Sequence, residues 1–250
     1  LKQVFKIFNP IIVVNLAAQP GVRASIKDPL TYINSNIIGF LNIIDCCKSF
    51  SVEGFYYASS SSVYGNSNNI PSIEKSNSYN PLALYGITKR ADEMIAHSYS
   101  QLYNINTTAL RYFTVYGPWG RPDMAIFKFI KGIMDGKPIT VYNKGNIKRD
   151  FTHIDDIVIG TKSAMDKNYN NEIFNIGTGE SVKLLDLISI IESEVGRKAN
   201  IDYQPLPLYD ALETCANIEY SKKKIGFKPK ISVDVGVPKL IKWYKEYYNV

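Results

Sequence analysis

Short apolar runs alternate with longer amphipathic stretches along the first half of the chain. Residues 11–16 and 55–59 are short runs rich in β-branched or aromatic side chains, which is typical of strands buried on both faces. Residues 29–49 and 81–103 carry apolar side chains at helical spacing, and residues 107–112 form another short run. Strands that alternate with long helices imply right-handed crossovers. The pattern therefore predicts an α/β fold with a doubly wound parallel sheet.

The second half of the chain continues with shorter elements. Helical patterns cover residues 124–134, 155–165, 184–195, 221–225 and 233–248, and extended pieces cover residues 140–142, 149–152 and 173–176. Two aspartates begin the 155–165 helix, where the helix dipole favours acidic side chains. In folds of this class, ligands bind in the crevice at the carboxyl ends of the strands. We expect the functional site there.

Composition limits the class of protein. With 250 residues and 45% hydrophobic content, the chain can bury a substantial core. The net charge of +6 is spread along the sequence, so we expect no nucleic-acid partner, although the excess suits an anionic substrate. Three cysteines and two histidines have no spacing typical of disulfides or metal ligands. No apolar run is long enough to span a membrane, and we expect a cytoplasmic protein without a metal ion or a membrane partner.

Tyr85 and Lys89 are four residues apart on the predicted helix 81–103, so they share one helical face. A nearby ammonium favours the phenolate and lowers the pKa of a tyrosine from its usual value of about 10. Ser60, in the preceding loop, has a hydroxyl that can share a substrate's proton. The three residues are candidates for proton transfer. On spacing alone, a core tyrosine beside a solvated lysine is an equally good interpretation.

Longer motifs surround this pair and extend over nearly the whole chain. They are Asn15-Leu-Ala-Ala-Gln-Pro-Gly-Val-Arg23, Asn34-Ser-Asn36, Ala58-Ser-Ser-Ser-Ser-Val-Tyr-Gly65, Tyr85-Gly-Ile-Thr-Lys89, the run from Arg111 to Ala125, Arg149-Asp-Phe-Thr-His-Ile-Asp-Asp156 and Phe174-Asn-Ile-Gly177. Together they resemble the extended short-chain dehydrogenase/reductase family. The most specific part, Pro118-Trp-Gly-Arg-Pro-Asp-Met124, looks like the UDP-glucuronate 4-epimerases.

The resemblance implies an NAD-dependent 4-epimerase of nucleotide sugars that works through a 4-keto intermediate. Tyr85 would be the base and acid, Lys89 would lower its pKa and bind the nicotinamide ribose, and Ser60 would share the proton of the sugar's O4. The residues that would contact NAD are Ala17, Ala18, Asn36, Tyr85, Lys89 and Phe113. From its sequence context alone, Asn36 also fits a capping or turn asparagine.

The same resemblance implies a UDP-sugar site. Arg149 would bind the UDP phosphates, Arg23 would reach the sugar or its phosphate, and Asp210 would contact the ribose. Tyr142 would stack on uracil, although packing within a buried strand explains it nearly as well. The resemblance also implies two lobes, a Rossmann-like NAD domain of residues 1–113 plus about 149–177 and a smaller α/β substrate lobe of residues 114–148 and 178–250. The family's usual homodimer pairs helices equivalent to residues 29–49 and 81–103.

Ser61 and Ser62 help to choose among members of the family. Sugar 4,6-dehydratases carry Asp-Glu at this pair, and UDP-glucuronate decarboxylases carry Glu at the position of Ser62, so two neutral hydroxyls favour plain epimerisation. A 4-keto uronic acid readily loses carbon dioxide, so the enzyme must hold its carboxylate in a poor orientation for leaving. Paired guanidinium donors do this well. We expect Arg121 in this role, with hydroxyls from Thr114, Ser61 and Ser62, which predicts conversion of UDP-glucuronate to UDP-galacturonate.

A dinucleotide site of this class needs a Gly-rich turn after its first strand. Neither G-x-x-G-x-x-G nor G-x-G-x-x-G occurs in the sequence, and Gly177-Thr-Gly179 favours a plain turn. Relative to the family, we expect the sheet to lack its first strands, and the chain to be an N-terminally truncated epimerase. Two alternatives stay open, a UDP-glucose/UDP-galactose-type 4-epimerase and a non-catalytic remnant that no longer holds NAD.

Overall fold

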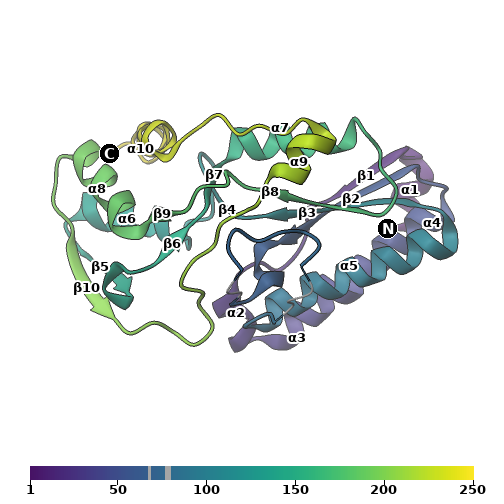
Figure 1. Cartoon of the computed structure of the whole chain (residues 1–250), viewed down its shortest axis with the longest axis horizontal. Coiled ribbons are helices and arrows are strands. Elements are labelled where there is room, and N and C mark those ends of the chain that lie inside the picture. Colours follow the sequence, from purple (N-terminus) through teal and green to yellow (C-terminus); the bar gives the residue numbers. More distant parts are fainter. Residues whose placement is uncertain (67–68, 77–79) are drawn as a thin grey trace.

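A four-stranded parallel sheet forms the centre of the larger part of the molecule (Figure 1). The computed structural model describes residues 1–66, 69–76 and 80–250. The strands lie in the order β1 (Ile12–Asn15), β2 (Gly54–Ser60), β3 (Asn106–Tyr112) and β8 (Glu172–Ile176). All three pairings are parallel, and β2 and β3 are buried along most of their length. The predicted α/β fold with a Rossmann-like parallel sheet is confirmed.

Helices cover both faces of this sheet (Figure 1). On one face, α1 (Lys2–Phe8), α4 (Gly39–Ser49) and α5 (Leu84–Tyr103) pack their apolar residues against Phe55, Tyr57 and Ala109. On the other face, α7 (Ile154–Met165) and α9 (Glu219–Ile225) pack against Leu110, Phe174 and Ile176. Successive strand residues point to opposite faces of a sheet. The alternation of Ala109 and Leu110 therefore supplies both cores.

The stretch 29–49, predicted as one helix, is three consecutive elements. It begins as α3 (Pro29–Tyr32), capped by Asp28, continues as the π-helix η1 (Ile33–Ile38) and ends as α4. The predicted helical pattern over residues 29–49 is confirmed, but its π segment was not predicted, because a single π turn changes the apolar spacing by only one residue. A π turn is rare and often lies at a functional site. The short helix α2 (Val22–Lys27), which precedes it, was not predicted.

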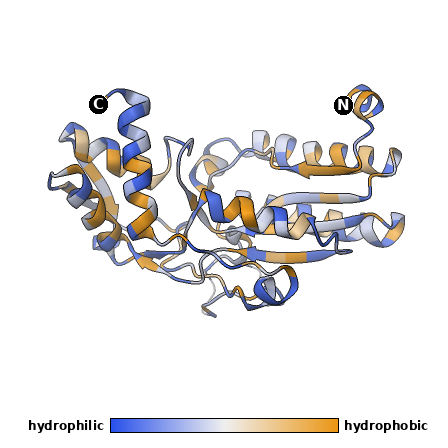
Figure 2. Cartoon of the chain, turned by 90° about the horizontal axis from the view of Figure 1, so that it is seen from above, coloured by the Kyte–Doolittle hydropathy of each residue, from blue (hydrophilic) through white to orange (hydrophobic). Residues whose placement is uncertain are grey.

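A second group of elements lies at the other end of the molecule, around its own hydrophobic core (Figure 2). Its helices are α6 (Ala125–Asp135), α8 (Leu184–Val195) and α10 (Val233–Tyr248). Its strands form three pairs: β5 (Pro138–Tyr142) with β10 (Asn200–Gln204), β4 (Thr114–Tyr116) with β7 (Phe151–His153), and β6 (Lys148–Arg149) with β9 (Val182–Lys183). The 3₁₀ turns are η2 (Ser61–Tyr64) and η3 (Asn143–Gly145). Strand β10 was not predicted because its residues are polar and mostly exposed.

The packing bears on the division into two lobes, which remains our proposal. Phe151 belongs to the core of the smaller group, together with the helices α6, α8 and α10. Ile225 and Phe227 belong to the core beside the sheet. We therefore propose that β7 joins the substrate lobe and that α9 joins the Rossmann-like lobe. Limited proteolysis that releases a fragment with any other grouping would argue against this division.

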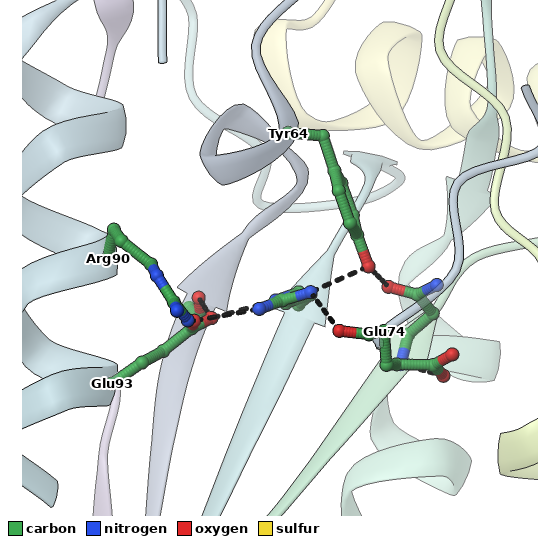
Figure 3. Close-up of polar contacts among 7 residues, drawn as sticks. Tyr64, Glu74, Arg90 and Glu93 are labelled. Carbon is green, nitrogen blue, oxygen red and sulfur yellow. Dashed lines mark hydrogen bonds and ion pairs between the residues drawn. The ribbon is translucent and has the colours of Figure 1, made fainter. Parts of the chain in front are cut away.

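A buried arginine lies in the middle of the sheet. Arg111 on β3 is fully buried and donates two hydrogen bonds to the Glu93 carboxylate of α5, each 2.8 Å long. It also donates to the phenol oxygen of Tyr64 at 2.9 Å and to the carbonyl oxygen of Glu74 at 3.2 Å (Figure 3). Although burial opposes it, Arg111 keeps the pKa of Glu93 below its usual value. The guanidinium thus connects α5, η2 and the loop before α5.

Further hydrogen bonds extend this network to both neighbouring strands. The Tyr64 hydroxyl donates to Asn175 of β8 at 2.7 Å, and the backbone N–H of Asn175 donates to the Glu74 carboxylate at 2.9 Å. On β2, the Ser59 hydroxyl donates to Glu93 at 2.6 Å. Buried polar groups are stable only when they are paired in this way. The network therefore sets the position of α5 on the sheet.

Replacing Glu93 by Gln is expected to lower the free energy of unfolding by about 3–5 kcal/mol, because it leaves the buried Arg111 charge uncompensated. The measurement is urea unfolding followed by circular dichroism. The matched control is Asp166→Asn, which removes an exposed ion pair with Lys162 on α7 and is expected to cost less than about 1 kcal/mol. A loss as small for the Glu93 variant as for the control would contradict the importance of the buried pair.

Candidate active site

A cleft of about 560 Å³ opens at the carboxyl ends of the strands. Its wall includes eleven of the residues that the sequence singled out: Ala18, Ser60, Ser61, Ser62, Tyr85, Lys89, Phe113, Thr114, Arg121, Arg149 and Asp210. The parallel register brings them together, because Ser60 at the end of β2 pairs with Tyr112 at the end of β3. The cleft therefore lies where the strand pattern placed the functional site.

Ser60 and the following turn form one side of the cleft. The Ser60 hydroxyl accepts a hydrogen bond from the backbone N–H of Ser62 at 3.2 Å, and so caps the turn η2. Gly86, in the first turn of α5, lies against this turn. A Cβ atom at Gly86 would be 2.6 Å from the carbonyl oxygen of Ser62. The absence of a side chain at this position thus lets the helix that carries Tyr85 approach the serines closely.

Tyr85 lies in the first turn of α5, half-buried, with its ring edge-on to Tyr32 at 6.3 Å. Burial raises the pKa of Tyr85, and a hydrogen bond with Ser60 and the positive charge of Arg121 partly oppose this rise. The predicted lowering by Lys89 was wrong for this structure. The Lys89 ammonium instead lies 3.3 Å from the Asp92 carboxylate, and both side chains are buried. The sequence did not single out Tyr32 or Asp92, although the i, i+3 spacing of Lys89 and Asp92 was visible.

Asn36, predicted to contact the cofactor, is almost completely buried in η1. Its side-chain oxygen accepts from the N–H of Gln19 at 2.7 Å. Its amide nitrogen donates to the carbonyl oxygen of Gln19 at 3.1 Å and to the hydroxyl of Thr88 at 3.0 Å. The side chain therefore connects the segment after β1 to α5. In that segment Ala18 lines the cleft, whereas Ala17 is exposed and donates its N–H to Asn15.

A second cavity of about 900 Å³ adjoins the cleft, and Thr114, Arg121, Arg149 and Asp210 line both. Arg149 donates to the Asp210 carboxylate at 2.5 Å, and a nitrogen of Arg23 lies 3.9 Å from the same group. The Arg23 guanidinium also lies 4.6 Å from the centre of the Tyr142 ring. Four residues predicted for the UDP-sugar therefore meet in one place. Lysines also line this cavity, and its excess of positive charge favours an anionic ligand.

Arg121 reaches the cleft from the loop between β4 and α6. Its guanidinium forms two hydrogen bonds with the Asp123 carboxylate, at 3.0 and 2.5 Å. Trp119 in the same loop has a positive φ of 62° and packs against Trp243 and Tyr247 of α10, with ring centres 5.3 and 5.1 Å away. These contacts hold the loop against the C-terminal helix. Trp243 and Tyr247 are far away in the sequence, and no local pattern pointed to them.

Other kinds of site receive no support from the described residues. In residues 1–66, 69–76 and 80–250, no group of three or more His, Cys, Asp and Glu side chains could hold a metal ion. Within the same ranges, no helix is long and apolar enough to cross a membrane. The three cysteines are free and buried.

Comparisons with known proteins agree with this geometry. Residues 1–177 match the family model of the NAD dependent epimerase/dehydratase family. The chain belongs to this family. It is 45% identical to the protein CapI of Staphylococcus aureus over all of this chain and 80% of that protein. It is 40% identical to UDP-glucuronate 4-epimerase 4 of Arabidopsis thaliana, over all of this chain and 61% of that protein.

Solved structures of the family are similar over almost the whole chain. A UDP-glucuronic acid 4-epimerase from Bacillus cereus, in complex with UDP-glucuronic acid and NAD, has a TM-score of 0.93 at 34% identity, over 99% of this chain and 78% of that chain. A UDP-glucose 4-epimerase from Thermotoga maritima has a TM-score of 0.94 at 28% identity, over 99% of this chain and 81% of that chain. The predicted resemblance to an NAD-dependent epimerase family, close to the UDP-glucuronate 4-epimerases, is confirmed.

The cleft has a chemistry that fits the nicotinamide end of NAD. The small side chain of Ala18 follows β1 and leaves room beside the strand ends, and Phe113 supplies an apolar surface. Lys89 lines the same wall, and an ammonium group is a donor that suits ribose hydroxyls. For the pyrophosphate, the sequence of this chain has no Gly-rich turn. The residues that would contact NAD are therefore Ala18, Tyr85, Lys89 and Phe113.

Proposed function

We propose that this chain carries the catalytic and substrate-binding residues of a UDP-sugar 4-epimerase that converts UDP-glucuronate to UDP-galacturonate. One observation carries the proposal: Tyr85, Ser60 and Arg121 line a single cleft that adjoins an arginine-lined cavity. The similarity to UDP-glucuronate 4-epimerases of Arabidopsis thaliana and Bacillus cereus supports it. Because the relatives are longer than this chain, the proposal concerns the part of the enzyme that these residues form.

In this proposal Tyr85 exchanges a proton with the C4 hydroxyl of the sugar. NAD, when bound, supplies the reversible oxidation of that carbon. Ser60 lies in the same wall of the cleft as Tyr85 and would share the proton through its hydroxyl. The half-buried position of Tyr85 favours its neutral form, so positive charge nearby is needed for it to act as a base. Arg121 supplies part of this charge in the structure, and Lys89 is another cation in the wall of the cleft.

The UDP group fits the cavity beside the cleft. We propose that Arg23 and Arg149 bind the diphosphate, because guanidinium groups match phosphate oxygens with paired donors. Asp210, which both arginines approach, would accept from a ribose hydroxyl. Tyr142 offers its ring to the uracil base beside the Arg23 guanidinium.

The uronate carboxylate fits the Arg121 side of the cleft. Ser61, Ser62 and Thr114 lie in the same wall and offer neutral hydroxyls. The Asp123 carboxylate holds the Arg121 guanidinium and limits its rotation, so the arginine can keep the sugar carboxylate in one orientation. The same ion pair also supports the alternative, a UDP-glucose/UDP-galactose-type 4-epimerase, because it occupies donors that a substrate carboxylate would use.

Replacing Tyr85 by Phe is expected to lower kcat by at least about 100-fold, because general acid–base catalysis contributes this much or more. KM should change little. Tyr85 must lose its proton before it can act as a base. Because the pKa of Tyr85 is raised, kcat of the wild type should increase with pH only above neutral pH. The matched control is Tyr99→Phe, also a half-buried tyrosine on α5. Equal activity of both variants, measured by coupled assay of the product sugar, would exclude Tyr85 as the base.

Replacing Arg121 by Ala tests which sugar is used. With UDP-glucuronate, kcat/KM should fall by about 10- to 100-fold, the value of a charge-assisted hydrogen bond, or the product should lose carbon dioxide. With UDP-glucose, the effect should be small. The control is Arg197→Ala, which removes a guanidinium bound to the Met134 carbonyl. Equal losses of kcat/KM for UDP-glucuronate and UDP-glucose would favour the neutral-sugar alternative. If calorimetric titration shows that the chain does not bind NAD, the non-catalytic remnant is favoured.

We also propose a homodimer in which the predicted helices pair. Ile87, Met94 and Leu102 are exposed on α5, and Leu41 is exposed on α4. Exposed apolar side chains on neighbouring helices are typical of a helix–helix interface. Size-exclusion chromatography with light scattering should give twice the mass of one chain, and Met94→Glu should give the mass of one chain. A wild type with the mass of one chain at micromolar concentration would refute the dimer.

A further inference from the structure

Asp92 is a buried acid on α5 that the proposed reaction does not use. It follows Lys89 by three residues and Tyr85 by seven, so the three side chains share one face of the helix. Its side chain is fully buried, and one of its carboxylate oxygens lies 3.3 Å from the Lys89 ammonium. Its other oxygen, Oδ1, has no hydrogen-bond partner among the residues that the structure describes.

A carboxylate in this position opposes folding when it is ionised. Burial raises the pKa of Asp92 to about 7, and the Lys89 charge only partly opposes the rise. An unpaired buried oxygen costs free energy that an apolar side chain would not. Lys89, the partner of Asp92, lines the cleft, and buried acids beside a specific charge at such a place are concentrated at functional sites.

The groups that face Asp92 leave Lys89 as its counter-ion. Glu93, the next residue of the helix, already binds Arg111, Arg90 and Ser59. Tyr57 on β2 is buried and neutral, and Asp92 and Glu93 add to the rise of its pKa. Asp92 also raises the pKa of Tyr85. In the described part of the chain, two charged groups thus act on Asp92. Lys89 favours its ionised form, and Glu93 disfavours it.

We propose that Asp92 is a positioning residue that acts through Lys89: its ionised carboxylate binds the ammonium and withholds part of that positive charge from Tyr85. When Asp92 is protonated, the ammonium is free to act on Tyr85. The contact itself is a feature of the structure, and its consequence for turnover rests on the proposed function. One unit charge at about 10 Å with an effective dielectric constant of about 20 changes a proton affinity by about one pH unit.

The ionisation of Tyr85 tests the proposal without turnover. The tyrosinate difference spectrum between the full chain and its Tyr85→Phe variant, recorded during alkaline titration, isolates this phenol. Replacing Asp92 by Asn keeps the size of the side chain and should lower the midpoint by about one pH unit. In the Lys89→Met background, Asp92 has lost its cation, so its carboxyl group stays protonated to a higher pH. Replacing Asp92 by Asn should then leave the midpoint of the Tyr85 titration nearly unchanged. An unchanged midpoint in the first case, or a full shift in the second, would overturn the proposal.

Stability against pH gives an independent check. The folded-state pKa of Asp92 lies above the unfolded value of about 3.9, so the folded protein holds the proton more tightly and loses stability as the pH rises. Between about pH 5 and pH 8, the unfolding equilibrium constant of the wild type should rise by at least about tenfold relative to Asp92→Asn. The control Asp166→Asn should follow the wild type. Parallel curves for the wild type and Asp92→Asn would overturn the proposal.

Enzyme assays separate this inference from the proposed function. In Asp92→Asn, the rise of kcat should move to lower pH by the same amount as the Tyr85 midpoint, with KM little changed. A wild type that does not turn over UDP-sugars refutes the proposed function, whereas the phenol titration and the unfolding series still decide the role of Asp92. A loss of stability at every pH with an unmoved phenol midpoint would show that Asp92 serves packing alone, and would contradict the proposal.

Discussion

The ion pair between Arg111 and Glu93 is the interaction on which the site depends. A charged pair in the middle of a sheet is costly to bury, and the hydrogen bonds around it offset this cost. Ser59, Tyr64 and Asn175 supply these partners from β2, η2 and β8. The same contacts fix the position of α5 along the strands of the sheet. The first turn of that helix therefore meets the serines at the end of β2.

Helix α5 arranges charge as well as side chains. Its inner face carries Tyr85, then Lys89, then Asp92 and Glu93, so the helix presents a phenol, a cation and two acids in succession. Glu93 is neutralised by Arg111, whereas Asp92 binds the Lys89 ammonium. Because burial weakens solvation, these short-range contacts decide which groups carry charge. The charge available in the cleft wall thus depends on residues behind it.

The two groups of elements, around the sheet and around the second core, make different contributions to the cleft. The sheet presents strand ends and α5, which are held by the buried network. The smaller group of elements contributes Arg121 and Arg149, and its aromatic contacts between Trp119, Trp243 and Tyr247 keep the Arg121 loop in place. Asp210 connects the two sides, because it lies beside both Arg23 and Arg149. Residues from both parts of the chain therefore line the same cleft and the cavity beside it.

The sequence alone determined the parallel α/β fold, most of its strands and helices, and the family. Apolar periodicity and short motifs are local features. They can therefore be recognised in the sequence without knowing which residues pack against them. It did not reveal the π turn at Asn36, because one π turn inside a longer helix changes the apolar spacing by only one residue. Only the tertiary structure decided that Lys89 binds Asp92, and that burial raises the pKa of Tyr85. Such outcomes depend on solvent exclusion and on partners far along the chain, which spacing within a motif does not record.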